Sequence, residues 1–139
     1  MIRQGQTFSF RKELYQGVHD LSTDVLKLAL YTADADLPLT VTEYTAANEV
    51  ANGNGYTTGG KTCENVTINS SSTGQVYISF DNLTWTGTFT CRGALIYNTS
   101  KSNKSVAVLD FGADKTVTSQ TLTVTLPANT ADSALIRSV

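Results

Sequence analysis

Residues 83–98 read LTWTGTFTCRGALIYN, and this stretch decides the fold class of the chain. Successive side chains of a β-strand point to opposite faces, so every second residue shares a face. The series that starts at Leu83 is apolar or small, whereas the series that starts at Thr84 is polar as far as Arg92. Threonine is β-branched and suits a strand position that faces water. The stretch therefore predicts a strand with one buried face. Its glycines, Gly87 and Gly93, mark bends and leave open one kinked strand or a pair of strands.

The rest of the chain continues in short apolar runs between turn signals. Residues 25–32 are apolar on nearly both faces, which predicts a strand in the middle of a sheet. Further strands are predicted at residues 61–68, 75–80, 105–111, 121–126 and 134–136, and short helices at 10–16 and 42–50. Strands at intervals of about ten residues are typical of sandwiches and barrels. We predict an N-terminal arm, residues 1–10, and one all-β domain, residues 11–139. That domain is an antiparallel β-sandwich, Ig-like or jelly-roll-like, with one or two short helices.

The composition narrows the classes of function. The chain has 139 residues and a net charge of −2, and only 16% of its residues are charged, against about 25% in typical soluble domains. Its lysines and arginines are scattered, so we expect no sequence-independent binding of nucleic acid. No apolar run approaches the length of a membrane span, and the N-terminus lacks the apolar core of a secretory signal. We therefore expect a protein made in the cytoplasm that does not act in a membrane.

One segment matches a nucleotide-binding motif letter for letter. Residues 55–62 read GYTTGGKT, which fits the P-loop pattern G-x-x-x-x-G-K-[ST]. In a P-loop the segment joins a buried strand to a helix whose N-terminus holds the phosphates. Here the residues after Thr62 are β-branched and then polar, and they cannot form an amphipathic helix. We predict a glycine turn that enters a strand, with Lys61 in solvent and no bound nucleotide.

No other group of residues indicates catalysis or a cofactor. His19, Asp20 and Ser22 contain the letters of a catalytic triad, but residues so close in one segment favour a polar turn. His19 is the single histidine of the chain, which removes the usual zinc and iron sites. Asp34 and Asp36 lack the spacing of a calcium loop. We expect no enzyme activity, no catalytic residue, no metal and no cofactor.

The apolar pattern also predicts which side chains form the core. Trp85 could serve a sugar-binding surface, but its place in the apolar series favours the core. Asp110 lies near a predicted strand end and favours a contact within a turn. Cys63 and Cys91 leave a disulfide open, although free thiols are favoured because Cys91 falls in the apolar series. The residues that we expect to be buried together are Val76, Ile78, Trp85, Phe89, Leu95, Leu122 and Val124, with Thr84, Thr86 and Thr123 outside.

Four segments carry a resemblance to a known group of proteins. They are KELYQGVHDLSTDVLKLALYT at residues 12–32, NEVANGNGYTTGG at 48–60, LTWTGTFTCRGALIYN at 83–98 and VLDFG at 108–112. In this order and spacing they resemble a group of small virion proteins of tailed bacteriophages. The resemblance covers residues 10–112. It implies a structural, non-enzymatic role in the virion and supplies no catalytic residue.

Within a virion we expect a cement or decoration protein on the outside of an icosahedral capsid. The partners would be the major capsid protein or other virion proteins, and a homotrimer fits the three-fold positions of a shell. The alternative is a component of the tail, neck or fibre base, including a module that contacts carbohydrate. Ile2, Phe8 and Phe10 are the candidate interface residues, because they place apolar groups in an otherwise polar arm. The arm either orders against a neighbouring subunit or pairs as an edge strand within its own domain.

Overall fold

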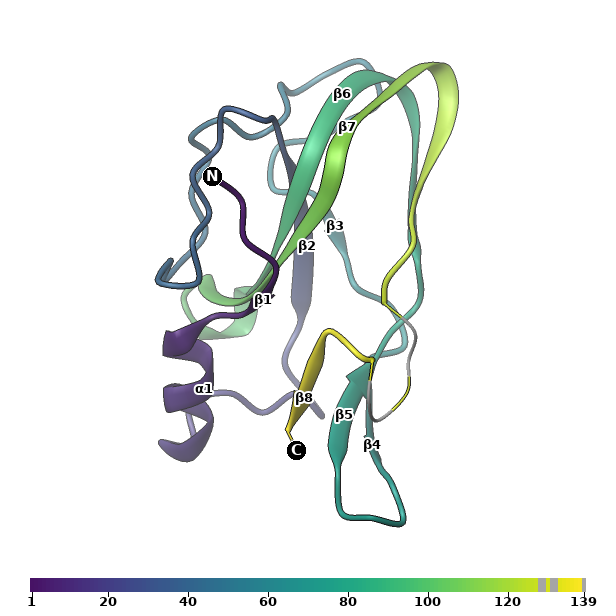
Figure 1. Ribbon diagram of the computed structural model, residues 1–139. Coiled ribbons are helices and arrows are strands. Elements are labelled where there is room, and N and C mark those ends of the chain that lie inside the picture. Colours follow the sequence, from purple (N-terminus) through teal and green to yellow (C-terminus); the bar gives the residue numbers. More distant parts are fainter. Residues whose placement is uncertain (128–129, 131–132, 139) are drawn as a thin grey trace.

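The structure is a computed structural model that describes residues 1–127, 130 and 133–138 (Figure 1). Its elements are β1 (Gly5–Gln6), α1 (Phe8–Tyr15), β2 (Leu26–Tyr31), β3 (Lys61–Thr62), β4 (Thr67–Ser70), β5 (Val76–Ser79), β6 (Leu83–Asn98), the short 3-10 helix η1 (Thr99–Lys101), β7 (Lys104–Val124) and β8 (Ile136–Ser138). Strands dominate, and α1 is the one α-helix in the described part of the chain. The predicted all-β class is therefore confirmed.

The strands form two antiparallel sheets. The larger sheet has the order β1-β7-β6-β2-β3, and the smaller has the order β4-β5-β8. β6 and β7 make one long hairpin that bends over at the top of Figure 1. The far arm of this hairpin, where Leu83 pairs with Val124, lies across the main core from β2. The central position predicted for residues 25–32 is confirmed, because β2 pairs with both β6 and β3.

Extra residues in β7 produce the bend of the hairpin. Cys91 pairs with Lys115 and Gly93 with Asp110, so β7 has several more residues than β6 between these two pairs. Bulges of this kind bend a strand and increase its twist. Gly112 lies in this insertion with a φ of +79°, and its amide donates to the Asp110 carboxylate at 2.9 Å. The turn contact expected for Asp110 is therefore present, although the strand continues beyond it.

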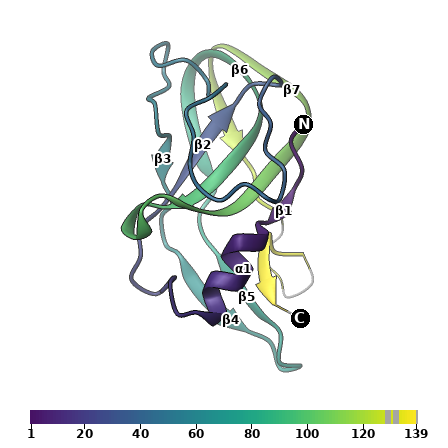
Figure 2. The same cartoon turned by 90° about the vertical axis from the view of Figure 1, so that its left-hand side faces the viewer.

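The bend reverses which face of β6 meets the main core. Before it, Leu83, Trp85 and Cys91 face the main core; after it, Ala94 and Ile96 do. Leu95 faces a second cluster on the other side of the larger sheet, so the expectation that it packs with Trp85 is wrong. The members of this second cluster are Ala29, Tyr31, Ala35, Leu37, Leu95, Tyr97 and Val108. Figure 2 shows the long segment between β2 and β3 covering this face of the sheet.

Several other expectations are corrected. Val76 is exposed rather than buried, whereas Ile78 and Val124 belong to the core and Phe89 and Leu122 are half-buried against it. Thr84, Thr86 and Thr123 are exposed, as predicted. The two strands predicted at residues 105–111 and 121–126 belong largely to one continuous strand, β7. The strand predicted at residues 61–68 is divided between β3 and β4. The helix predicted at residues 42–50 is absent. The last of these segments crosses the second cluster as a loop, held by contacts such as Tyr44 N to Asn103 O.

The helix begins earlier than the apolar spacing predicts. Thr7 caps α1, because its hydroxyl accepts from the Phe10 amide at 3.3 Å. The expected helix began at Phe10, whereas the observed helix includes the last three residues of the predicted arm, 8–10. Gly17 follows the helix with a φ of +72°, a conformation that favours glycine at this position.

Candidate functional site

The N-terminal arm lies along the protein's own domain. Gly5 pairs with Val108 of β7, and the Arg3 amide donates to Leu37 O at 3.0 Å. The Leu37 amide in turn donates to Met1 O at 2.7 Å. Of the two arrangements open for the arm, the structure has the edge strand within the domain.

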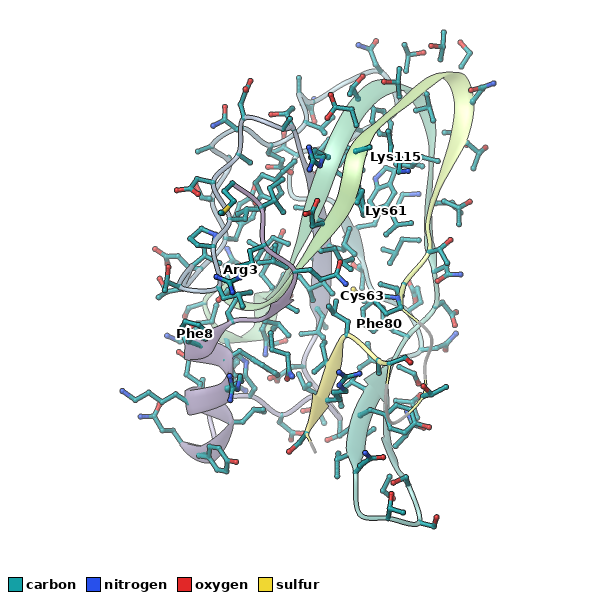
Figure 3. All side chains as sticks on the ribbon, viewed as in Figure 1. Arg3, Phe8, Lys61, Cys63, Phe80 and Lys115 are labelled. Carbon is teal, nitrogen blue, oxygen red and sulfur yellow. The ribbon has the colours of Figure 1, made fainter. Side chains whose placement is uncertain are left out.

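The three candidate interface residues have different surroundings. Ile2 is half-buried and packs on the second cluster, close to the backbone at Gly93. Phe10 is completely buried in the main core, which removes it from a candidate interface. Phe8 is half exposed and lies on the outside of the molecule at the start of α1 (Figure 3). Phe8 is therefore the one residue of the three whose side chain is exposed enough to contact a partner.

Exposed apolar side chains gather around Phe8. Seven large apolar side chains are exposed in the described part of the chain, and five of them lie on α1 or on the neighbouring β4–β5 hairpin. These five are Phe8 (53% exposed), Leu14 (41%), Tyr15 (92%), Ile68 (51%) and Val76 (40%). We call the surface made by these five residues together with Arg11 and Lys12 the α1 face.

The α1 face is hollowed. A groove of about 280 Å³ lies between α1 and the smaller sheet, and Leu14, Ile68 and Val76 all line it. A second hollow, of about 910 Å³, lies along the outer side of α1 and is lined by Phe8, Tyr15 and Leu14. Leu14 and the ends of β1 and β8 line both, so the two hollows are neighbours.

Sequence reasoning missed most of this face, although a signal was present. Phe8, Arg11, Lys12 and Tyr15 have the i, i+3, i+4, i+7 spacing of one helix face. Starting the helix at Phe10 hid this pattern. Ile68 and Val76 share a face of the small sheet with Ile78, because Ile68 pairs with Ile78 and the positions alternate. Nothing in the sequence indicates that this face of the small sheet packs beside the helix.

The P-loop look-alike is a turn that enters strand β3, as predicted. A Cβ on Gly55 would lie 2.2 Å from Thr86 O, so the glycine allows the turn to pack directly on β6. The loop amides are already bonded: Gly59 N donates to Glu49 Oε2 at 2.7 Å, and Thr58 N donates to Asn52 Oδ1 at 3.1 Å. Lys61 is not simply solvated, because its ammonium donates to Thr84 O and lies 5.4 Å from the centre of the Trp85 ring. That no nucleotide binds here stays a prediction.

A second polar cluster surrounds Glu49. Tyr44 and Tyr56 donate to its two carboxylate oxygens at 2.6 and 2.5 Å. Tyr56 Oη also accepts from the buried Leu30 amide at 3.0 Å. Tyr97 stacks on Tyr44 with ring centres 4.6 Å apart and donates to Gly59 O. Glu49 thus joins the loop over the second cluster to the glycine turn and to β2.

His19 occupies a buried position rather than a turn exposed to water. Its imidazole lies between Glu13 and Asn98, and Phe10 packs against it with ring centres 4.9 Å apart. The side chains of Asp20 and Ser22 hydrogen-bond to each other at the surface. The triad letters therefore form two separate structural contacts.

Thiols and metal ligands are not assembled into a site in the described residues. Cys63 and Cys91 are both buried and unpaired, and Figure 3 shows Cys63 near Phe80 between the two layers. Burial raises the pKa of each thiol to about 12. Within the described ranges no three histidine, cysteine, aspartate or glutamate residues come together as a metal site. In the same ranges no helix is long and apolar enough to cross a membrane.

Comparisons of the chain with protein-family models, with curated proteins and with solved structures find no match.

Proposed function

We propose that this chain is a non-enzymatic structural protein of a tailed-phage virion, which binds the outside of the capsid as a cement or decoration protein. The observation that supports this proposal best is the α1 face. Soluble monomers rarely expose a large contiguous apolar patch, and such patches commonly mark interaction sites. The resemblance of residues 10–112 to small virion proteins supplies the context in which the partner is a neighbouring virion protein.

The arrangement of polar groups fits a structural role. Among the described residues, every buried side-chain nitrogen or oxygen has a hydrogen-bond partner. His19 and Glu49 are the side chains here that could most readily transfer protons, and each is held by hydrogen bonds between elements of the fold. A homotrimer at the three-fold positions of a shell would repeat the same α1 face on each subunit.

Locating the chain in purified virions tests the proposal. We expect quantitative mass spectrometry to find it in a fixed ratio to the major capsid protein, and cryo-electron microscopy to place it on every capsomer. A single ring of copies at the neck, tail or fibre base would support the alternative role instead. Absence of the chain from purified virions would contradict both roles.

A further inference from the structure

The exposed side of α1 combines aromatic rings with cations. Phe8 and Tyr15 lie two turns apart on one face of the helix, and Arg11 and Lys12 lie between them on that face. All four residues are exposed. The acidic residue of the helix, Glu13, points elsewhere, because its carboxylate is bound by His19 and by Lys104. The larger hollow along α1 is lined by basic, polar and apolar residues, with no aspartate or glutamate, whereas the smaller groove has Asp20 among its lining residues.

This charge distribution contrasts with that of the whole chain. The net charge is −2, so anions outnumber cations elsewhere on the protein. In addition, Arg92 and Lys101 are paired with Asp110 and Asp24. The cations of α1 are concentrated beside the exposed apolar side chains. A partner that fits must bring negative charge and apolar side chains together.

We propose that the α1 face binds an acidic segment of a partner protein, whose apolar side chains enter the groove between α1 and the β4–β5 hairpin. Leu14, Ile68 and Val76 contact those apolar side chains, and Phe8 and Tyr15 extend the contact along the helix. Arg11 and Lys12 pair with the carboxylates of the segment. This inference deepens the proposed function and rests on it for the role of the α1 face as an attachment surface.

The shape of the face favours a peptide over a lipid surface. The apolar residues line a groove of about 280 Å³, which accepts protruding side chains and not the flat surface of a bilayer. A juxtamembrane cation contributes only about 1 kcal/mol of attraction to an anionic leaflet. The two exposed cations of α1 are too few to hold the domain there, and a helix of eight residues offers little apolar area to insert.

Peptide titrations of the isotope-labelled full chain, followed by NMR, test the inference. The probe is a synthetic peptide in which leucine and glutamate alternate. One control peptide has lysine in place of glutamate, and another has serine in place of leucine. We expect saturable shifts of the amides of α1, β4 and β5 with the leucine–glutamate peptide alone, and weaker binding at higher salt.

Variants locate the binding. Arg11→Glu and Leu14→Glu should each weaken binding at least about tenfold, which is one step of 1.4 kcal/mol in affinity. Lys115→Glu makes the same change in net charge as Arg11→Glu but lies far from α1 (Figure 3), so it should leave binding unchanged. Circular dichroism establishes that each variant is folded. Equal effects of Arg11→Glu and Lys115→Glu would show that only net charge matters and would overturn the inference.

Other outcomes are equally decisive. The inference is overturned by a dissociation constant weaker than about 1 mM, by equal binding of the lysine peptide, or by shifts on another face. Binding to vesicles of phosphatidylcholine and phosphatidylglycerol without binding to the peptide would assign the face to lipid instead. None of these results bears on whether the chain is in the virion, and its absence from virions would not alter a measured peptide affinity.

Discussion

His19 Nε2 lies 3.0 Å from a carboxylate oxygen of Glu13, and the imidazole is completely buried. On the other side of the ring, Nδ1 lies 3.0 Å from the amide nitrogen of Asn98. That nitrogen also donates to Asp24 at 2.7 Å, and Asn98 Oδ1 accepts from the Ser100 amide, which fixes the orientation of the side chain. An amide nitrogen can only donate, so Nδ1 accepts and the proton of the neutral ring lies on Nε2. One histidine thus ties α1 to the end of β6.

Acid should weaken this network at Asp24. Burial acts to raise the pKa of Asp24, but hydrogen bonds from Asn98, the Asp20 amide and Lys101 outweigh it and hold the pKa below the ordinary value of 3.8. A carboxyl with a lowered pKa contributes stability that is present above its unfolded value and lost as the pH falls through its folded value. The free energy of unfolding should therefore decline below pH 3.8. Asp24→Asn should reduce that decline and lower stability at neutral pH.

Urea unfolding at a series of pH values measures both effects. Asp34→Asn is the matched control, because Asp34 is exposed. We expect the control to unfold at the same urea concentration as the parent protein at neutral pH. An Asp24→Asn variant as sensitive to acid as the parent would show that other carboxyls carry the effect.

Alkali should act on the tyrosines around Glu49. Burial raises the pKa of Tyr97 to about 12, and burial also raises the pKa of Tyr31, Tyr44 and Tyr56, with Glu49 as the second cause in each case. A phenol with a raised pKa contributes stability that is present below its unfolded value of 10.0 and lost as the pH rises through its folded value. These four rings should therefore ionise only as the protein unfolds.

A spectrophotometric titration of tyrosinate, run beside circular dichroism, makes the comparison. The tyrosinates of these four residues should appear together with the loss of the β-sheet signal. Ionisation of all six tyrosines while the sheet signal is intact would contradict the buried arrangement. Tyr15→Phe removes the phenol hydroxyl of a residue that is 92% exposed and should not change the coincident step.

The close packing of the glycine turn on β2 can be tested by comparing two glycines that have the same backbone conformation but different surroundings. Gly60 and Gly112 have φ values of +81° and +79°, but a Cβ on Gly60 would lie 1.9 Å from Leu28 O, whereas a Cβ on Gly112 would meet nothing within 4 Å. Gly112→Ala should cost about 1–2 kcal/mol, the strain of a left-handed residue. Gly60→Ala adds a clash with the β2 backbone, which raises the cost by about 1–3 kcal/mol. Thermal or urea unfolding measures the difference, and equal costs would show that the turn does not press on β2.

The fold class could be predicted from the sequence because alternation is a local property. Trp85 is buried and Thr84 and Thr86 are exposed, as the period of two requires. Leu95 lies ten residues after Trp85, an even spacing, and yet faces the other cluster. The reason lies in β7, whose extra residues opposite Cys91 and Gly93 bend the hairpin. The apolar run after Arg92 shows that both faces of β6 become buried, but it does not show which residues share a cluster with Trp85.

The candidate surface was less predictable for a similar reason. Phe8 was recognised as an apolar residue in a polar segment, whereas Phe10 has the same local character and is completely buried. With the helix capped at Thr7, Phe8 lies on its exposed side and Phe10 on its buried side, and no local pattern distinguishes the two rings. The approach of the β4–β5 hairpin to α1 depends on contacts between residues more than fifty positions apart, which no local pattern records.

Burial on both sides of β6 after the bend can be tested at two consecutive residues. Leu95 packs in the second cluster and Ile96 in the main core, and both are completely buried. Leu95→Ala and Ile96→Ala should each lower the free energy of unfolding by about 2–5 kcal/mol. Thr86→Ala, on the arm that alternates, should cost less than about 0.5 kcal/mol. Urea unfolding would contradict the bend if either of the first two variants behaved like Thr86→Ala.

Deleting Met1–Gln6 should destabilise the domain itself. The arm pairs with β7 and with Leu37, and Ile2 packs on the second cluster near Gly93. Its removal uncovers the edge of β7 and part of this cluster, so we expect a lower melting temperature. Ile2→Ala should reproduce part of the loss, whereas Arg3→Ala, an exposed position, should not. If the truncated protein melted like the parent and lost only its ability to oligomerise or coat capsids, the arm would be an attachment device and its pairing within the domain would be dispensable.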